Sequence, residues 1–289
     1  MNQRLFRLLL LVGCCNAPAA HAAESYDNCT GFIDTLPATI STQGTWCLRH
    51  DLSTAITSGN AIVIATNNVT IDCNHHKLGG LAAGTGTGAY GIFAEDRHNA
   101  TVRRCAIRGF RVGIYFHGTA SASGPGSGHL IEDNRLEQNT WMGISLDGDN
   151  NRVQRNRIYD TGNAPFTNTA WGMAVDNAEV IDNTVAGVYA TGSANNAIGI
   201  HMDGWGIEAR GNQVRDLAPA GTGVALGLVN NFGTTNFTGN WVSSILAVDG
   251  TGIAAKSGSP KSTCRDNTVV NFATGIAANC LDAGGNSVQ

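Results

Sequence analysis

The sequence predicts an all-β protein, a right-handed parallel β-helix of about eight to nine coils. Three observations predict this solenoid: an asparagine phrase returns along the chain, a glycine phrase falls between its copies, and no unit contains a helix-length apolar segment. Glycine accounts for 37 of the 289 residues and proline for only six, a balance that suits many short strands joined by tight turns.

The asparagine phrase is an apolar residue, two other residues, Asn, one other residue and a second apolar residue, as in residues 131–136. The positions in this register are Asn74, Cys105, Asn134, Asn156, Asn183, Asn212, Asn240 and Asn267. Successive positions lie 22 to 31 residues apart, which is typical of a solenoid with variable loops. We expect each asparagine to adopt a left-handed backbone conformation at a sharp turn and to hydrogen-bond to the next asparagine along the column.

The glycine phrase is Gly followed by an apolar residue, and it falls between successive asparagine phrases. Its glycines are Gly91, Gly113, Gly143, Gly172, Gly199, Gly252 and Gly275, with either Gly223 or Gly227 in the coil after Gly199. Because side chains alternate along a strand, we expect the second and fourth residues of each phrase to face inward and the third and fifth to face solvent.

The first 22 residues have the pattern of an export signal: Arg4 and Arg7, an apolar run, and small residues ending in Ala20-His21-Ala22. An alternative is lipoprotein processing at Cys14, which follows Leu-Val-Gly. We expect residues 23–60 to form an N-terminal cap with the first strands and residues 61–289 to form the repeat domain. The expected location is secreted or periplasmic, and no later segment has the pattern of a transmembrane span.

Six cysteines remain after the expected signal, an even number without the C-x-x-C spacing of zinc or redox sites, so disulfides are expected. Near neighbours in a solenoid favour the pairs Cys29–Cys47, Cys73–Cys105 and Cys264–Cys280. Removal of Arg4 and Arg7 with the signal leaves 16 basic against 22 acidic residues, a net charge of −6. This charge argues against a nucleic-acid partner.

Two phrases, residues 69–74 and residues 102–110, resemble those of right-handed parallel β-helix proteins in the pectate-lyase-like superfamily. The resemblance extends over about residues 40–289 as a repeat pattern. It implies the fold, but the superfamily includes lyases, hydrolases, epimerases and proteins without known catalysis. The chain lacks the full polygalacturonase motif set, although His117-Gly118 resembles one element, and it lacks the Asp-Pro-His signature of mannuronan epimerases.

The fifth positions of the glycine phrases predict a polar column on one sheet. In coil order they are Glu95, His117, Asp147, Asp176, Asp203, Asn231, Lys256 and Asn279. Neighbouring coils are about 4.8 Å apart, so the three aspartates would repel unless they lean apart or share a proton or a cation such as calcium. Together with His201, these aspartates are the candidate catalytic residues. In the alternative interpretation each aspartate only caps the turn that follows it, since Gly or Asn comes next.

Aromatic and basic residues near this column are candidates for substrate binding, because flat apolar rings suit sugar stacking. The candidates are Tyr115, His117, Trp141, Trp171, Trp205 and Lys256. The alternative is that the aromatic rings pack against loops at the coil corners.

These observations favour an exported protein that binds an extended, acidic polysaccharide and processes it as a lyase, a glycoside hydrolase or an epimerase. The rival hypothesis is a non-catalytic cell-envelope or adhesion protein. No cofactor is expected apart from the calcium alternative, and the sequence leaves the oligomeric state open.

Overall fold

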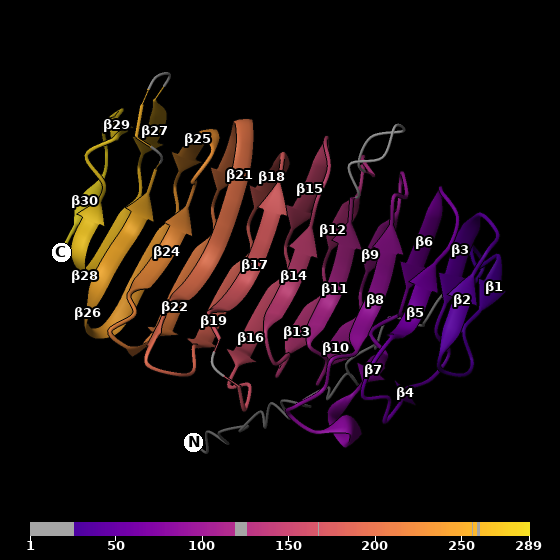
Figure 1. The fold of residues 1–289 in the computed structure, drawn as a ribbon. Coiled ribbons are helices and arrows are strands. Elements are labelled where there is room, and N and C mark those ends of the chain that lie inside the picture. Colours follow the sequence, from indigo (N-terminus) through magenta and orange to yellow (C-terminus); the bar gives the residue numbers. More distant parts are fainter. Residues whose placement is uncertain (1–25, 119–125, 167, 256, 259–260) are drawn as a thin grey trace, which may run out of the picture.

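The computed structural model describes residues 26–118, 126–166, 168–255, 257–258 and 261–289, so the expected signal with Cys14 lies outside the described residues. The described chain winds into a right-handed parallel β-solenoid of about eight turns (Figure 1). The predicted fold class is therefore confirmed. Within these ranges the one helix is η1 (Leu81–Ala83), a single 3-10 turn.

Each coil contributes a strand to each of three faces. The strands of the first, which we call the glycine face, are β2 (Ala38–Ile40), β5 (Asn60–Ile64), β8 (Tyr90–Glu95), β11 (Val112–His117), β14 (Met142–Leu146), β17 (Ala170–Asp176), the first part of β21 (Ala197–Arg210), β24 (Ala225–Val229), the last part of β26 (Trp241–Ala254) and the end of β28 (Thr268–Ile276). In the ambiguous coil Leu228 pairs with Ile200, so Gly227 is the phrase glycine.

The chain then turns onto the second face and next onto the third. The second face is built from β1 (Gly31–Phe32), β3 (Gly44–Cys47), β6 (Val69–Asp72), β9 (Thr101–Arg103), β12 (Leu130–Glu132), β15 (Asn151–Gln154), β18 (Ala178–Ile181), the last part of β21, β25 (Gly233–Thr238), β27 (Ser262–Arg265) and β29 (Cys280–Asp282). The third face is built from β4 (Leu52–Ser53), β7 (Lys77–Gly79), β10 (Ala106–Arg108), β13 (Arg135–Glu137), β16 (Arg157–Gly162), β19 (Thr184–Tyr189), β22 (Gln213–Ala218), the first parts of β26 and β28, and β30 (Ser287–Val288). A short antiparallel pair, β20 (Ala194–Asn195) and β23 (Ala220–Gly221), lies outside these faces.

The core is a stack of apolar side chains that repeat coil by coil. One column on the glycine face consists of Ile62, Ile92, Ile114, Ile144, Met173, Ile200, Leu228 and Ile253, all fully buried. Close packing also explains the phrase glycines. A Cβ on Gly172 would lie 2.4 Å from Val185 Cγ1 and 2.5 Å from the carbonyl oxygen of Gly199, so a larger residue does not fit.

The corner between the second and third faces contains the asparagine column. The expectation that each asparagine is itself left-handed is wrong for Asn134 and the later members: the left-handed residue is the one before it. Those preceding residues are Asp133, Arg155, Asp182, Gly211, Gly239, Asp266 and Gly285, with φ between 53° and 73°. The bend is therefore made one residue earlier, and the asparagine side chain points inward, where Asn183 and Asn212 are fully buried.

These asparagines hydrogen-bond from coil to coil. Asn183 Nδ2 donates to Asn212 Oδ1 at 3.1 Å and to the Val153 carbonyl at 2.8 Å. Its Oδ1 accepts from the backbone N–H of Asn156 at 2.9 Å and from Asn156 Nδ2 at 3.0 Å. The expected column of hydrogen bonds is thus present, and each amide also satisfies backbone groups of the coil before it.

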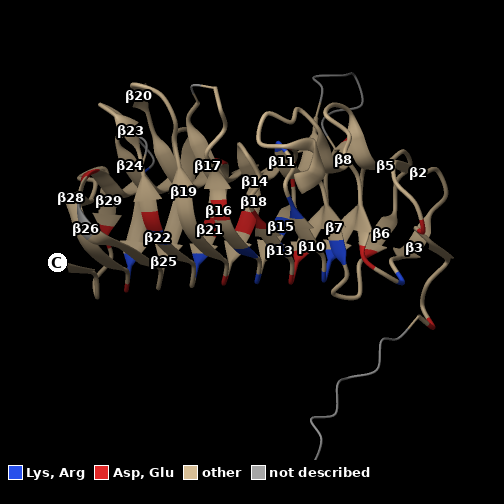
Figure 2. Cartoon of the chain, turned by 90° about the horizontal axis from the view of Figure 1, so that it is seen from below, with Lys and Arg blue, Asp and Glu red and all other residues tan. Residues whose placement is uncertain are grey.

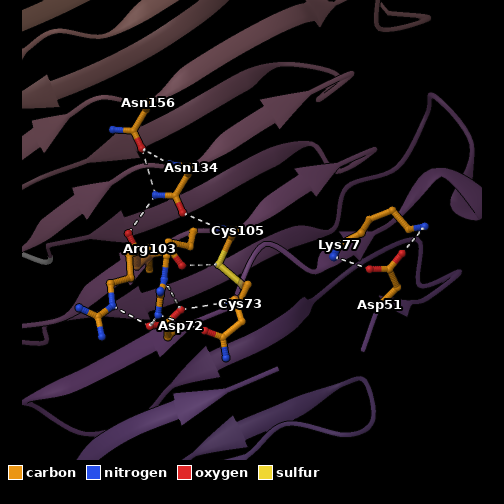
Figure 3. Close-up of a disulfide and its surroundings, with 11 residues drawn as sticks. Asp51, Asp72, Cys73, Lys77, Arg103, Cys105, Asn134 and Asn156 are labelled. Atoms are coloured by element: carbon orange, nitrogen blue, oxygen red, sulfur yellow. Dashed lines mark hydrogen bonds and ion pairs between the residues drawn. A yellow bond between two sulfur atoms is a disulfide. The ribbon is translucent and has the colours of Figure 1, made fainter. Parts of the chain in front are cut away.

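Towards the N-terminus the column ends at a disulfide. Cys105 occupies the asparagine register and donates its backbone N–H to Asn134 Oδ1, while its sulfur bonds Cys73 of the preceding coil (Figure 3). The other two bridges join Cys29 to Cys47 and Cys264 to Cys280, so all three predicted pairs are confirmed. Disulfides of this kind fit an extracellular or periplasmic protein.

Charged residues gather along this asparagine corner. In Figure 2 they form a row of alternating sign along the lower edge of the solenoid. Many are paired: Arg155 bonds both Asp133 and Glu132, and the buried Asp72 accepts from Arg103 and Arg104. Much of the basic charge on this edge is thus taken up by neighbouring carboxylates.

We predict that Asn183→Ala lowers the free energy of unfolding by about 3–4 kcal/mol, because several buried backbone and amide groups lose their partners. Asn236→Ala, which removes an exposed amide from the second face, is the control and should change stability by less than about 0.5 kcal/mol. Urea denaturation of both variants measures the difference. Equal stability of the two variants would contradict a structural role for the column.

Candidate functional site

The polar column lies at the carboxyl end of the glycine face. His117 is paired with Glu95, and Asp176 is paired with Asp203. The pairing of Leu146 with Val175 places Asp147 beside Asp176. The structure therefore brings Asp147, Asp176 and Asp203, which we call the aspartate strip, together from three consecutive coils, each partly exposed.

The two outer carboxylates of the strip bind groups on the sides away from Asp176. Asp147 Oδ2 lies 2.8 Å from His117 Nδ1 and accepts from the Gly118 N–H at 3.2 Å, both in the preceding coil. Asp203 Oδ1 accepts from the backbone N–H groups of Asn231 and Phe232, each at 2.9 Å, in the following coil. Repulsion between the carboxylates is thus relieved by the outer two leaning apart.

Asp176 differs from its neighbours because, within the described residues, its carboxyl group accepts no hydrogen bond. Burial, together with the negative charges of Asp147 and Asp203, raises the pKa of Asp176 to about 6. Near pH 6 this carboxyl is therefore divided between its acidic and ionised forms, a property that suits a general acid.

The turn-capping interpretation therefore fits two of the three aspartates in part and does not fit the third. Asp147 and Asp203 do accept backbone N–H groups, although these belong to turns of neighbouring coils and not to the turn after each aspartate. Asp176 caps no turn in the described chain. Of the three, Asp176 is the one whose position these hydrogen bonds do not explain.

His201 lies beside the strip, on the outward position two residues before Asp203. Its Nε2 is 3.7 Å from Asp203 Oδ2 and accepts from Asn231 Nδ2 at 3.0 Å. Burial lowers the pKa of His201, and the charge of Asp203 opposes this shift without overcoming it. The imidazole is therefore neutral at neutral pH, as its accepted hydrogen bond requires.

Aromatic rings flank the strip on the same face. Tyr115 contacts Tyr90, Phe93 and His117, with ring centroids 4.7, 5.7 and 5.6 Å apart. Further along the face, Trp171 meets the edge of His201 at 5.0 Å. The register position of Tyr115 is occupied by Ser145, Ala174 and His201 in the next three coils. Only two small side chains therefore lie between Tyr115 and His201 at this position.

Small side chains therefore separate two aromatic groups by three coil rises, or about 14 Å. This arrangement suits a row of sugar rings lying beside the aspartates. Ser145, Ala174 and the contact of Asn231 with His201 were not predicted from the sequence. The signal available in the sequence was the small third residue of two successive glycine phrases.

The remaining candidates lie elsewhere or outside the described residues. Trp141 lies at the opposite border of the glycine face, where the Arg111 guanidinium covers its ring at 4.7 Å. Trp205 follows the strip on the turn to the second face and is 58% exposed. Lys256 lies outside the described residues.

Two features of the described residues concern metal ions and membranes. No group of three or more His, Cys, Asp or Glu side chains is arranged there to hold a metal ion. Nor does that part of the chain contain a helix with the length and apolar character needed to cross a membrane.

Comparison with known proteins gives a family. The model of the right-handed β-helix region matches residues 50–214 and 90–269. The chain belongs to this right-handed β-helix family. No curated protein matches the chain. A solved structure similar to this β-helix is the catalytic domain of a GH87 alpha-1,3-glucanase in complex with nigerose, with 12% identity and a TM-score of 0.38; the match covers 88% of this chain and 62% of the glucanase chain.

We predict that Asp176→Asn is more stable than the wild type at pH 8, by about 1–2 kcal/mol, and similar to it at pH 4. Folding raises the pKa of Asp176. The stability that this carboxyl contributes is therefore fully present at pH values below its pKa in the unfolded chain, and it is lost as the pH rises through about 6. Denaturation at both pH values measures the effect.

Asp147→Asn is the matched control. It removes a carboxylate that binds His117 and the Gly118 N–H, and it should lower stability at pH 8. If Asp176→Asn also lost stability at pH 8, the account of Asp176 as a strained, uncompensated carboxyl would be wrong.

Proposed function

We propose that the protein is an exported glycoside hydrolase that binds an extended, uncharged polysaccharide along the glycine face. The observation that carries the proposal is Asp176, an unbonded carboxyl group between two others in register. The family membership and the three disulfides are compatible with this function but do not select it.

Charge argues for an uncharged substrate and against the acidic polysaccharide expected from the sequence. The described members of the polar column include four acids, Glu95, Asp147, Asp176 and Asp203, and no Lys or Arg. A uronate chain would meet repulsion along this column. A lyase would also need a Lys or Arg beside the uronate carboxylate, and none of the described column members is either residue.

In the proposed reaction Asp176 donates its proton to the glycosidic oxygen as the bond to the anomeric carbon breaks. Asp203 takes a proton from the attacking water, whose oxygen bonds the anomeric carbon. Asp203 Oδ1 is occupied by two backbone N–H groups, which leaves Oδ2 on the side of the neutral His201 for this role. Asp147 raises the proton affinity of Asp176.

The leaning of the outer carboxylates favours inversion of configuration. Retaining enzymes place their two carboxyl groups about 5 Å apart, close to the rise between coils, whereas inverting enzymes need a wider gap that admits water. Because Asp203 is drawn towards the following coil, we expect its carboxyl group to stand further from that of Asp176 than the rise between coils.

We predict that protein beginning at residue 23 releases new reducing ends from a neutral glycan in a panel of glucans, mannans, xylans and galactans. Assays on pectate and alginate, with and without calcium, test the acidic alternative by ultraviolet absorbance of unsaturated uronates. The rate should fall as the pH rises above about 6, because Asp176 loses its proton, and NMR of the first product should show inversion.

Asp176→Asn should lower kcat by about 10²–10⁴-fold. Asp182→Asn, an exposed carboxyl at the asparagine corner, is the control and should leave the rate unchanged. Unsaturated products, or an active Asp176→Asn protein, would contradict the proposal. Binding without any product would favour the non-catalytic adhesion protein.

A further inference from the structure

A hollow of about 550 Å³ lies at the turn between the glycine face and the second face, and we call it the corner hollow. The residues of its lining that matter here are Asp149, Arg152, Asn177, Glu179, Trp205 and Gly206. It lies outside the row of sugar sites proposed above, because its walls belong to the turn and to the start of the second face.

The chain connects the corner hollow directly to the aspartate strip. Asn177 follows Asp176, and Trp205 comes two residues after Asp203. Asp149 likewise comes two residues after Asp147. The same three coils thus build the strip on one side of the turn and the hollow on the other, so a ligand on the strip lies within reach of the hollow.

Trp205 gives the hollow an open aromatic wall. Its side chain is 58% exposed, and its ring contacts Phe232 edge-on, with centroids 5.6 Å apart and an interplanar angle of 78°. One edge of the indole is therefore supported. Next to it, no atom outside Gly206 and its two chain neighbours lies within 4 Å of the position that a Cβ on Gly206 would take.

Planar polar groups form the rest of the wall, and they are held in place by one another. Asn177 Nδ2 donates to Asp149 Oδ1 at 2.7 Å, and Asn177 Oδ1 accepts from the backbone N–H of Trp205 at 3.3 Å. Arg152 pairs with Glu179 across neighbouring coils. An aromatic ring suits stacking against a sugar ring. The fixed hydrogen-bond donors and acceptors beside it, which include positive and negative groups, suit the hydroxyl groups of a sugar.

We infer that the corner hollow binds a sugar branch of the same uncharged polysaccharide whose main chain lies on the glycine face. A chain that follows the strip along the solenoid does not enter the hollow, whereas a side branch at the level of Asp176 crosses the turn into it. This inference rests on the proposed binding of a glycan, but not on its cleavage. It makes the protein selective for branched over linear glycans.

The test compares Trp205→Ala with Trp241→Ala, each made in the Asp176→Asn protein so that bound glycan is not cleaved. Trp241 is the matched control, since it is 55% exposed but lies on the third face. Isothermal titration calorimetry uses paired probes, galactomannan with linear mannan and arabinoxylan with debranched xylan. Trp205→Phe keeps an aromatic ring and checks that the loss does not come from misfolding.

We expect the parent to bind a branched probe at least tenfold more tightly than its linear partner. Trp205→Ala should remove that preference and leave the affinity for the linear chain unchanged, while Trp205→Phe and Trp241→Ala should keep it. Equal affinity for the two probes, or a preference that survives Trp205→Ala, overturns the inference and leaves the proposed hydrolysis standing. Trp205-dependent preference without cleavage by the wild type overturns hydrolysis alone. No binding of any probe overturns the inference, and it overturns hydrolysis as well if the wild type releases no reducing ends from the full glycan panel.

Discussion

The hydrogen-bonded asparagine column is the constraint on which the rest of the molecule depends. From Asn134 to Asn267, each side-chain amide satisfies backbone groups in the coil before it and bonds the asparagine of the next coil, and Asn286 ends the column. A coil that slipped by one residue would lose these buried bonds and turn its apolar residues outward. The column therefore fixes the register of all three faces, including the face that holds the aspartates.

Fixed register has an electrostatic consequence at the aspartate strip. Coils stacked about 4.8 Å apart bring like charges together wherever one outward position is acidic in successive coils. The structure relieves the repulsion by hydrogen bonds that draw Asp147 and Asp203 outward. Asp176, between them, has no such partner in the described chain and instead retains its proton to a higher pH. A repeat that stabilises the fold thus raises the pKa of one carboxyl group.

Much of the fold could be predicted from the sequence because its signals are local and repeat. The asparagine phrase, the glycine phrase and the six cysteines each mark a position in every coil or in neighbouring coils, and the three disulfides followed from that order. The left-handed residue was assigned one position too late, because Asp, Arg and Gly share that position and no single residue type marks it.

The candidate site was predicted less completely, since its chemistry depends on side-chain directions that the alternation of a strand does not give. The sequence placed three aspartates on one column but could not say that Asp147 and Asp203 bind neighbouring turns while Asp176 does not. It grouped Trp141 with the strip, although Arg111 covers that ring at the opposite border. The corner hollow had no signal, because its walls come from turns of variable length.

Titration of the Asp176 carboxyl group by NMR tests directly whether the stacking of the three aspartates raises its pKa. Protein labelled with ¹³C at the aspartate side chains, compared with its Asp176→Asn variant, identifies the Asp176 resonance. We expect this resonance to titrate with a pKa of about 6 in the wild type and with a pKa closer to the usual value in an Asp147→Asn variant that keeps Asp176. A pKa near 4 in the wild type would contradict it.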